Sequence, residues 1–152
     1  GMLYNHESPR RGHTFVTRKI TMTAARIKAG LEQELRLGNL DAARDWGYAP
    51  EYVKAMYLML QTDQPCDYII SSGVTHSVRD FVSLAFNHVG LDYHDHVIVD
   101  PAFYRAIEPI TLCGDNQSIL KNLNWHPTAT LETIVTAMVE HDQHVIRQQS
   151  LP

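Results

Sequence analysis

The chain has few cysteines and no apolar stretch of membrane-spanning length. Cys66 and Cys113 are the only cysteines in 152 residues, and their spacing fits no metal-ligand motif. We therefore expect two buried free thiols and a reducing, cytoplasmic setting. The first ten residues lack a basic start followed by an apolar run, so we expect no secretory signal.

The chain also lacks an excess of positive charge. Its 13 lysines and arginines against 17 acidic residues give a formal net charge of −4. This balance provides no general attraction to nucleic acid or to an anionic membrane, so we expect neither as a partner. With 44% hydrophobic and 20% charged residues, the composition is typical of one globular domain, which we place at residues 1–152.

Two motifs of nucleotide-cofactor enzymes are missing from the printed sequence. No G-x-G-x-x-G-type run follows a predicted strand, and none of the seven tyrosines has a lysine four positions later. We therefore predict no catalytic residue within this chain.

Helical spacing and capping signals predict five helices. Ile20, Ala24 and Ile27 indicate a helix over about residues 17–29, ended by Gly30. A second helix is predicted to start at Pro50, with Val53, Met56, Tyr57 and Leu60 at helical spacing. A third is predicted to start at the capping box of Ser77 and Asp80 and to end at Gly90. Two more are predicted to start at Asp115 and at Thr130.

Four short apolar segments predict strands, at residues 2–4, 35–38, 68–71 and 96–99. The polar segment 5–12, which contains Pro9 and Gly12, is predicted to be a loop. The order of the elements predicts a mixed α/β fold with several helices and short strands.

Three groups of cations lie in or beside predicted loops. Arg10 and Arg11 stand near Arg18 and Lys19, while Arg44 and Arg105 come from later segments. Because a guanidinium matches phosphate oxygens in a bidentate geometry, arginines from separate loops can clamp a diphosphate. Solvated surface charge is the alternative interpretation, and spacing alone favours it.

Several sequence runs resemble one enzyme family. They are NHESPRRG at 5–12, FVTRKI at 15–20, LGNLD at 37–41 with RDWG at 44–47, and THSVR at 75–79. In these runs the chain resembles the GDP-mannose 4,6-dehydratases, which are extended short-chain dehydrogenase/reductases. The resemblance implies the C-terminal, substrate-binding part of that α/β fold, with most of the Rossmann half missing and residues 1–12 a remnant of its strand and arginine-rich loop.

The resemblance also implies roles for individual residues. Substrate-binding positions would be Asn5, Val16, Lys19, Leu37, Arg44, Arg105 and Glu108, with the two arginines on the diphosphate and the glutamate on guanosine. His6 and Arg11 would contact NADP, and the loop that carries them would reach a neighbouring subunit of a tetramer. Two positions depart from the family pattern, since Tyr48 replaces a histidine and Ala106-Ile107 replaces Pro-Thr before the glutamate.

The implied activity is the lyase conversion of GDP-mannose to GDP-4-keto-6-deoxymannose and water, with this chain inactive alone. Two alternatives stay open, a non-enzymatic remnant or binding module and part of a related nucleotide-sugar epimerase or reductase. The pairs His94/His96 and His141/His144 lack an assured third ligand, so we expect no metal site. Trp46 and Trp125 are expected to be packing anchors.

Overall fold

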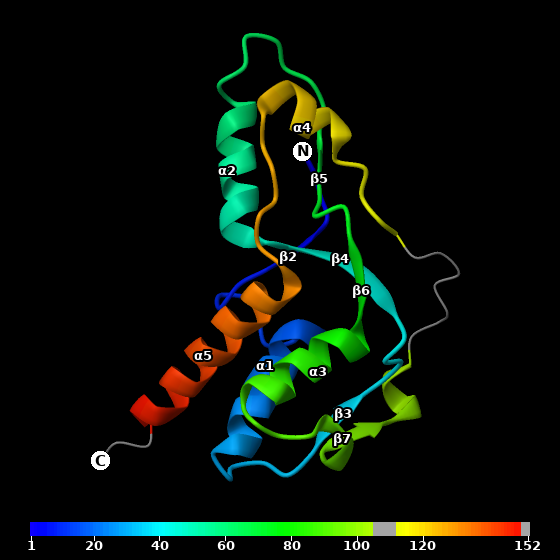
Figure 1. Ribbon diagram of the computed structural model, residues 1–152, viewed down its shortest axis with the longest axis vertical. Coiled ribbons are helices and arrows are strands. Elements are labelled where there is room, and N and C mark those ends of the chain that lie inside the picture. Colours follow the sequence, from blue (N-terminus) through cyan, green and yellow to red (C-terminus); the bar gives the residue numbers. More distant parts are fainter. Residues whose placement is uncertain (105–111, 150–152) are drawn as a thin grey trace.

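The computed structural model describes residues 1–104 and 112–149. Helices α1, α3 and α5 with strands β3 and β7 form one end of the molecule, and α2, α4 and β5 form the other (Figure 1). Strands β2, β4 and β6 lie between the two ends. Each end has its own hydrophobic core.

The larger core packs three of the predicted helices together. They are α1 (Val16–Lys28), α3 (Val78–His88) and α5 (Leu131–Gln149). Ile20, Phe81 and Met138 are fully buried between them. The predicted ends of two helices are confirmed, because Gly30 and Gly90 adopt φ of 72° and 69°, a region that side chains with a Cβ disfavour.

Three small sheets complete the backbone. β2 (Asn5–Glu7), β4 (Ala43–Tyr48) and β6 (Thr75–Ser77) form one sheet, in which β2 is parallel and β6 antiparallel to β4. β3 (Leu35–Leu37) pairs in parallel with β7 (Val97–Val99), and β1 (Met2–Leu3) pairs in parallel with β5 (Ile69–Ile70). The prediction of a loop over 5–12 was therefore wrong at its start, where pairing with β4 makes 5–7 a strand.

The smaller core lies between β1, β5, α2 (Ala49–Met59) and α4 (Gln117–Leu123). Tyr52 and Ala55 are the buried residues of α2, and Trp125 follows α4. The Trp125 indole donates from Nε1 to the carbonyl oxygen of Glu51 at 3.0 Å. Trp125 and Trp46 are 2% and 4% exposed, which confirms both as packing anchors.

The cysteine prediction needs correction. Cys66 and Cys113 are free, but both are exposed. Each lies in an irregular segment, the first between α2 and β5 and the second shortly before α4, so neither occupies a core position.

None of the described helices combines the length and apolar character needed to cross a bilayer.

Candidate functional site

The first group of predicted site residues lies where α1 meets the end of β3. Val16 opens α1 with its side chain exposed, and Lys19 follows one turn later. Lys19 Nζ donates to the carbonyl oxygen of Arg36 at 2.6 Å and stands 4.2 Å from the centroid of the Phe103 ring. Leu37 is only 3% exposed and belongs to the larger core, so it lies beneath the surface at this corner.

A close backbone approach fixes the same corner. A Cβ added to Gly38 would lie 2.4 Å from the carbonyl oxygen of Phe103, which ends the short helix η2 (Pro101–Phe103). Glycine is therefore required for the chain after β3 to touch η2. Arg105 and Glu108, two further predicted site residues, lie outside the described part of the chain.

The second group lies on the central sheet. Asn5 and His6 belong to β2 and pair with Trp46 and Gly47, while Arg44 lies on β4. Arg44 Nη1 donates to the carbonyl oxygen of Ala43 at 2.7 Å. The sheet thus brings three predicted residues from two sequence runs onto neighbouring strands.

The geometry of His6 defines which of its ring nitrogens carries the proton. Nδ1 is 2.8 Å from the carbonyl oxygen of Tyr4, which can only accept, so Nδ1 donates. In the neutral ring, Nε2 is then an acceptor, suited to a hydroxyl group such as that of a ribose. The ring also lies against Tyr52, with 5.1 Å between the centroids and 33° between the planes.

Arg11 is held by a buried carboxylate that the sequence patterns did not indicate. Its Nε is 3.3 Å from Glu7 Oε2, and its guanidinium carbon lies 3.6 Å above the Phe15 ring. Glu7 is 1% exposed and also accepts from the Thr17 hydroxyl at 2.5 Å. Burial raises the pKa of Glu7, and the bond from Thr17 and the charge of Arg11 oppose that rise.

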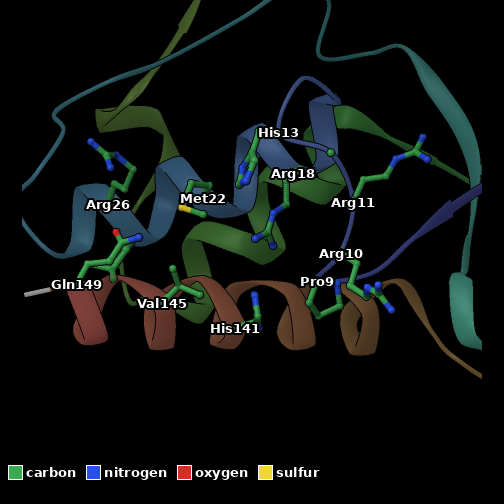
Figure 2. Close-up of a pocket in the computed structure, with 12 residues that line it drawn as sticks. Pro9, Arg10, Arg11, His13, Arg18, Met22, Arg26, His141, Val145 and Gln149 are labelled. Carbon is green, nitrogen blue, oxygen red and sulfur yellow. The ribbon is translucent and has the colours of Figure 1, made fainter.

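A basic pocket of about 700 Å³ lies between the 9–13 segment, α1 and α5 (Figure 2). Six cationic or titratable basic side chains line it: Arg10, Arg11, His13, Arg18, Arg26 and His141. Arg18 is buried and forms an ion pair with the fully buried Asp142 of α5, 2.6 Å from Nη2 to Oδ1. Among the predicted site residues that the structure describes, Arg11 alone lines this pocket.

A second buried acid, Asp45, organises the central sheet and was also missed. Its carboxylate accepts from the Ser72 hydroxyl at 2.6 Å and from the backbone nitrogens of Ser72, Gly73 and Gly114 at 2.8, 3.0 and 3.1 Å. It thereby joins β4, directly beside Arg44, to two loops. Sequence patterns did not predict strand β4, and only the pairing of this strand reveals that the Asp45 side chain faces inward.

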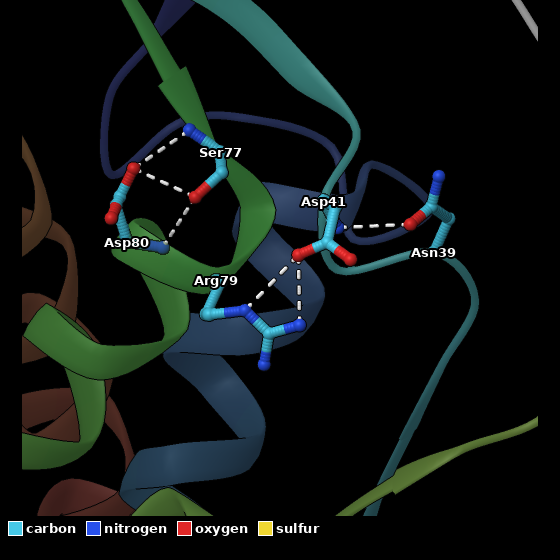
Figure 3. A network of polar contacts seen from close by, with 5 residues as sticks. All are labelled: Asn39, Asp41, Ser77, Arg79 and Asp80. Carbon is cyan, nitrogen blue, oxygen red and sulfur yellow. Dashed lines mark hydrogen bonds and ion pairs between the residues drawn. The ribbon is translucent and has the colours of Figure 1, made fainter.

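Two of the resembling sequence runs meet at the start of α3 (Figure 3). Arg79 donates from Nε and Nη2 to Asp41 Oδ1 at 3.1 and 2.8 Å. Ser77 and Asp80 form the predicted capping box, with Asp80 N donating to Ser77 Oγ at 3.0 Å and Ser77 N to Asp80 Oδ2 at 2.9 Å. The cap interpretation of Ser77 is confirmed.

Comparison with known proteins decides the family. The family model for GDP-mannose 4,6 dehydratase matches residues 1–138. This chain belongs to the GDP-mannose 4,6 dehydratase family. Within that family, GDP-mannose 4,6 dehydratase 1 of Arabidopsis thaliana is 44% identical over 151 residues, which are 99% of this chain and 42% of the relative. The GDP-mannose 4,6 dehydratase of Homo sapiens is 43% identical over 164 residues, or 97% of this chain and 44% of the relative.

The fold of this GDP-mannose 4,6 dehydratase family member is also that of solved epimerases and dehydratases. RMD from Pseudomonas aeruginosa, solved in complex with NADPH, superposes with a TM-score of 0.86 at 21% identity, covering 94% of this chain and 47% of that one. The dTDP-glucose 4,6-dehydratase of Bacillus anthracis, solved with NAD, gives 0.76 at 15% identity over 93% and 43%. The chain spans less than half the length of these relatives and matches their C-terminal part.

Among the described residues, no group of three or more histidine, cysteine, aspartate or glutamate side chains is placed to hold a metal ion. The described residues present cations, the His6 imidazole and backbone groups to a ligand at the start of α1 and on the central sheet.

Proposed function

We propose that this chain is the GDP-sugar-binding part of a GDP-mannose 4,6-dehydratase. Residues 1–152 would form a single substrate-binding domain. The observation that carries the proposal is the corner where Lys19, Gly38 and Phe103 meet, together with the family match over residues 1–138. Here a lysine ammonium and an aromatic ring lie side by side at the exposed start of α1. A phosphate and a nucleobase are the groups that such a pair binds.

The other proposed contacts follow from their positions. Val16 would line the base, with Leu37 packing beneath it. Asn5 and Arg44 would approach the sugar and diphosphate from the central sheet, and Arg105 and Glu108 would contribute the second diphosphate cation and the guanosine acceptor. All of these residues orient the substrate. Binding of this kind raises the rate only where acid–base groups and a hydride acceptor are also present.

NADP fits the residues that this chain contributes. The Nε2 of His6 is left as an acceptor by the bond from Nδ1 to Tyr4, and Arg11 is kept in place by Glu7 and Phe15. His6 would then bind a hydroxyl and Arg11 a phosphate of the cofactor. When bound, NADP would supply the acceptor and donor of the hydride in the conversion of GDP-mannose to GDP-4-keto-6-deoxymannose and water.

The cytoplasmic location and the tetrameric assembly belong to the same proposal. The tetrameric assembly rests on the 8–12 segment, where Arg11 is paired with Glu7 while Arg10 is exposed and could meet an acidic group of a neighbouring subunit. Light scattering on the complete enzyme would measure it.

Ligand titration of the chain tests the proposed function. We expect GDP-mannose to shift the amide NMR signals of Val16, Lys19 and Tyr104, and UDP-glucose to leave them in place. Lys19→Ala should weaken GDP-mannose binding about 10- to 100-fold, the range for a lost hydrogen bond to a charged group. Equal shifts with both sugar nucleotides would favour a related epimerase or reductase, and no shift with either would refute nucleotide-sugar binding.

A further inference from the structure

The basic pocket is a groove that runs along two helices. Its lining residues recur at every fourth position: Arg18, Met22 and Arg26 on α1, and His141, Val145 and Gln149 on α5. Residues four apart lie one above the other on a helix face, so the lining forms three successive layers (Figure 2). None of the proposed substrate-binding residues in the described part of the chain lines this groove.

The first layer combines a buried ion pair with two histidines. Arg18 and Asp142 contact each other and are 4% and 0% exposed. In the view of Figure 2, the Arg18 guanidinium lies between His13, from the 9–13 segment, and His141. Burial raises the pKa of Asp142, and the charges of Arg18, His141 and His13 are among the influences that oppose this rise. Both histidines therefore lie within electrostatic reach of the buried pair.

The same layer has donors that lack an acceptor. Arg18 Nε and Nη1 have no hydrogen-bond partner within residues 1–104 and 112–149, and the rings of His13 and His141 form no hydrogen bond or ion pair there. Asp142 balances Arg18, so protonation of the two histidines leaves two positive charges, and no carboxylate lines the groove. A dianionic phosphate would neutralise both charges, and its oxygens would accept from the imidazolium N–H groups.

Most other charged groups near the groove already have partners. These pairs are Arg11 with Glu7, Arg26 with Glu32, and His88 of α3 with Glu140 of α5. The Arg11 side chain also extends away from Arg18 in Figure 2. Arg10 is exposed at the 9–13 end of the groove and adds positive charge there. Because histidine ordinarily gains its charge between about pH 5 and pH 8, His13 and His141 make this end of the groove more positive at lower pH.

The second layer suits the uncharged part of a ligand. Met22 and Val145 line the groove one turn beyond Arg18 and His141. The three layers together span about 12 Å along the helices. With a volume of about 700 Å³, the groove holds far more than one phosphate ion. An apolar body attached to the phosphate would fill the space against these two side chains.

We propose that the basic pocket binds a phosphate ester with an apolar body. The dianionic phosphate lies between His13, Arg18 and His141, and the body lies against Met22 and Val145. This site goes beyond the proposed function. Its affinity falls as pH rises, because the two imidazoles lose their charge.

Phenyl phosphate is the probe, added to the purified chain and followed through amide NMR signals. It should shift the signals of His13, Met22, His141 and Val145, and it should bind more tightly than inorganic phosphate. His13→Gln and His141→Gln should each weaken binding about tenfold, as expected for a lost hydrogen bond between charged groups. The matched control is His144→Gln, since His144 is exposed on the same helix but does not line the groove. This variant should bind phenyl phosphate like the unchanged chain.

Sulfate measures the pH dependence, because it stays a dianion over the range in which histidine titrates. The unchanged chain should bind sulfate about tenfold more tightly at about pH 6 than at about pH 8, and the double variant His13→Gln with His141→Gln should lose this difference. Equal affinity for phenyl phosphate and inorganic phosphate would overturn the proposal, as would binding that neither single variant weakens. A homodimer that His141→Gln dissociates, seen by light scattering, would show that a second copy occupies the groove and would also overturn it.

Discussion

Single buried carboxylates do much of the positioning in this molecule. Asp45 is fully buried and accepts four hydrogen bonds from two loops that are far from it in the sequence. Glu7 similarly ties β2 to the start of α1 and to Arg11. Neither acid is predicted to contact a ligand. Glu7 holds Arg11, a predicted NADP contact, and Asp45 anchors the strand beside Arg44, a predicted substrate contact.

Replacing Asp45 should therefore affect stability and binding together. Asp45→Asn exchanges one accepting oxygen for an NH₂ group facing backbone donors, which should lower the free energy of unfolding by about 1–3 kcal/mol in urea titration. GDP-mannose binding should weaken as well, because Arg44 is its neighbour. Asp41→Asn is the control, since the Asp41 side chain is 75% exposed and its ion pair contributes little. Equal stability of the two variants would contradict the positioning role.

Glu7 should give the protein a distinct pH dependence. Burial raises its pKa above the ordinary value of 4.5, so the folded state binds a proton that the unfolded state has already released. Its contribution to stability is therefore present at lower pH and is lost as pH rises from about 4.5 through the raised pKa. In Glu7→Gln this part of the decrease should vanish from urea unfolding curves recorded between pH 4 and 8. An unchanged difference between the two proteins across this range would contradict it.

At the scale of elements, α1 and α5 are joined by an incompletely satisfied ion pair. Arg18 and Asp142 are both buried, yet Arg18 Nε and Nη1 have no hydrogen-bond partner among the described residues. Burial raises the pKa of Asp142, and the charge of Arg18 opposes that rise. We therefore expect that removing one partner lowers the stability of the protein by more than the intact ion pair contributes to it.

A double-mutant cycle would show this. Asp142→Leu alone should lower the free energy of unfolding by about 3–5 kcal/mol, because it leaves the Arg18 charge buried without a partner. Arg18→Met combined with Asp142→Leu should recover most of that loss in chemical denaturation, since two apolar side chains then fill the space. If the double variant lost as much as the sum of the singles, the interpretation would be wrong.

Helices were more predictable from the sequence than strands. Ser77, Gly30 and Gly90 mark helix ends through local chemistry, and the structure confirms all three. Strands β2, β4 and β6 contain polar runs without alternation, so only pairing with distant segments makes them strands. For the same reason, the sequence did not reveal that Asp45 is buried, although it indicated the neighbouring Arg44 as a site residue.

The apolar side of α2, formed by Val53, Met56, Tyr57 and Leu60, shows a second limit. The spacing of these residues correctly predicted a helix, but their side chains are exposed and lie outside this chain's own core. A periodic pattern reports that a helix has an apolar side, and it does not report which polypeptide covers that side. In the site, Lys19 meets Phe103 where Gly38 permits a backbone contact between distant segments, a geometry that spacing cannot reveal.

At the scale of the whole molecule, the sequence contains the proposed binding residues but no Tyr-x-x-x-Lys pair and no glycine-rich cofactor motif. We therefore expect the purified chain to convert no GDP-mannose, even with NADP added, in an assay that follows the 4-keto product. Catalysis requires groups that are placed to act on the reacting atoms of the bound substrate, and a binding surface alone does not supply them. The control is the complete enzyme of a relative in the same buffer, and product formed by the clean chain would refute the expectation.

The two unequal cores have a consequence for amide hydrogen exchange. The smaller core should open while the larger one stays folded, since it has six buried apolar residues against eighteen. Amides of α2, α4 and β5 should then exchange with deuterated solvent well before those of α1 and α3, as mass spectrometry would resolve. Strand β4 connects both ends, with Trp46 in the larger core and Gly47 pressed against Tyr52 of the smaller. Its amides would therefore mark the boundary between the part that opens alone and the part that opens only with the whole molecule.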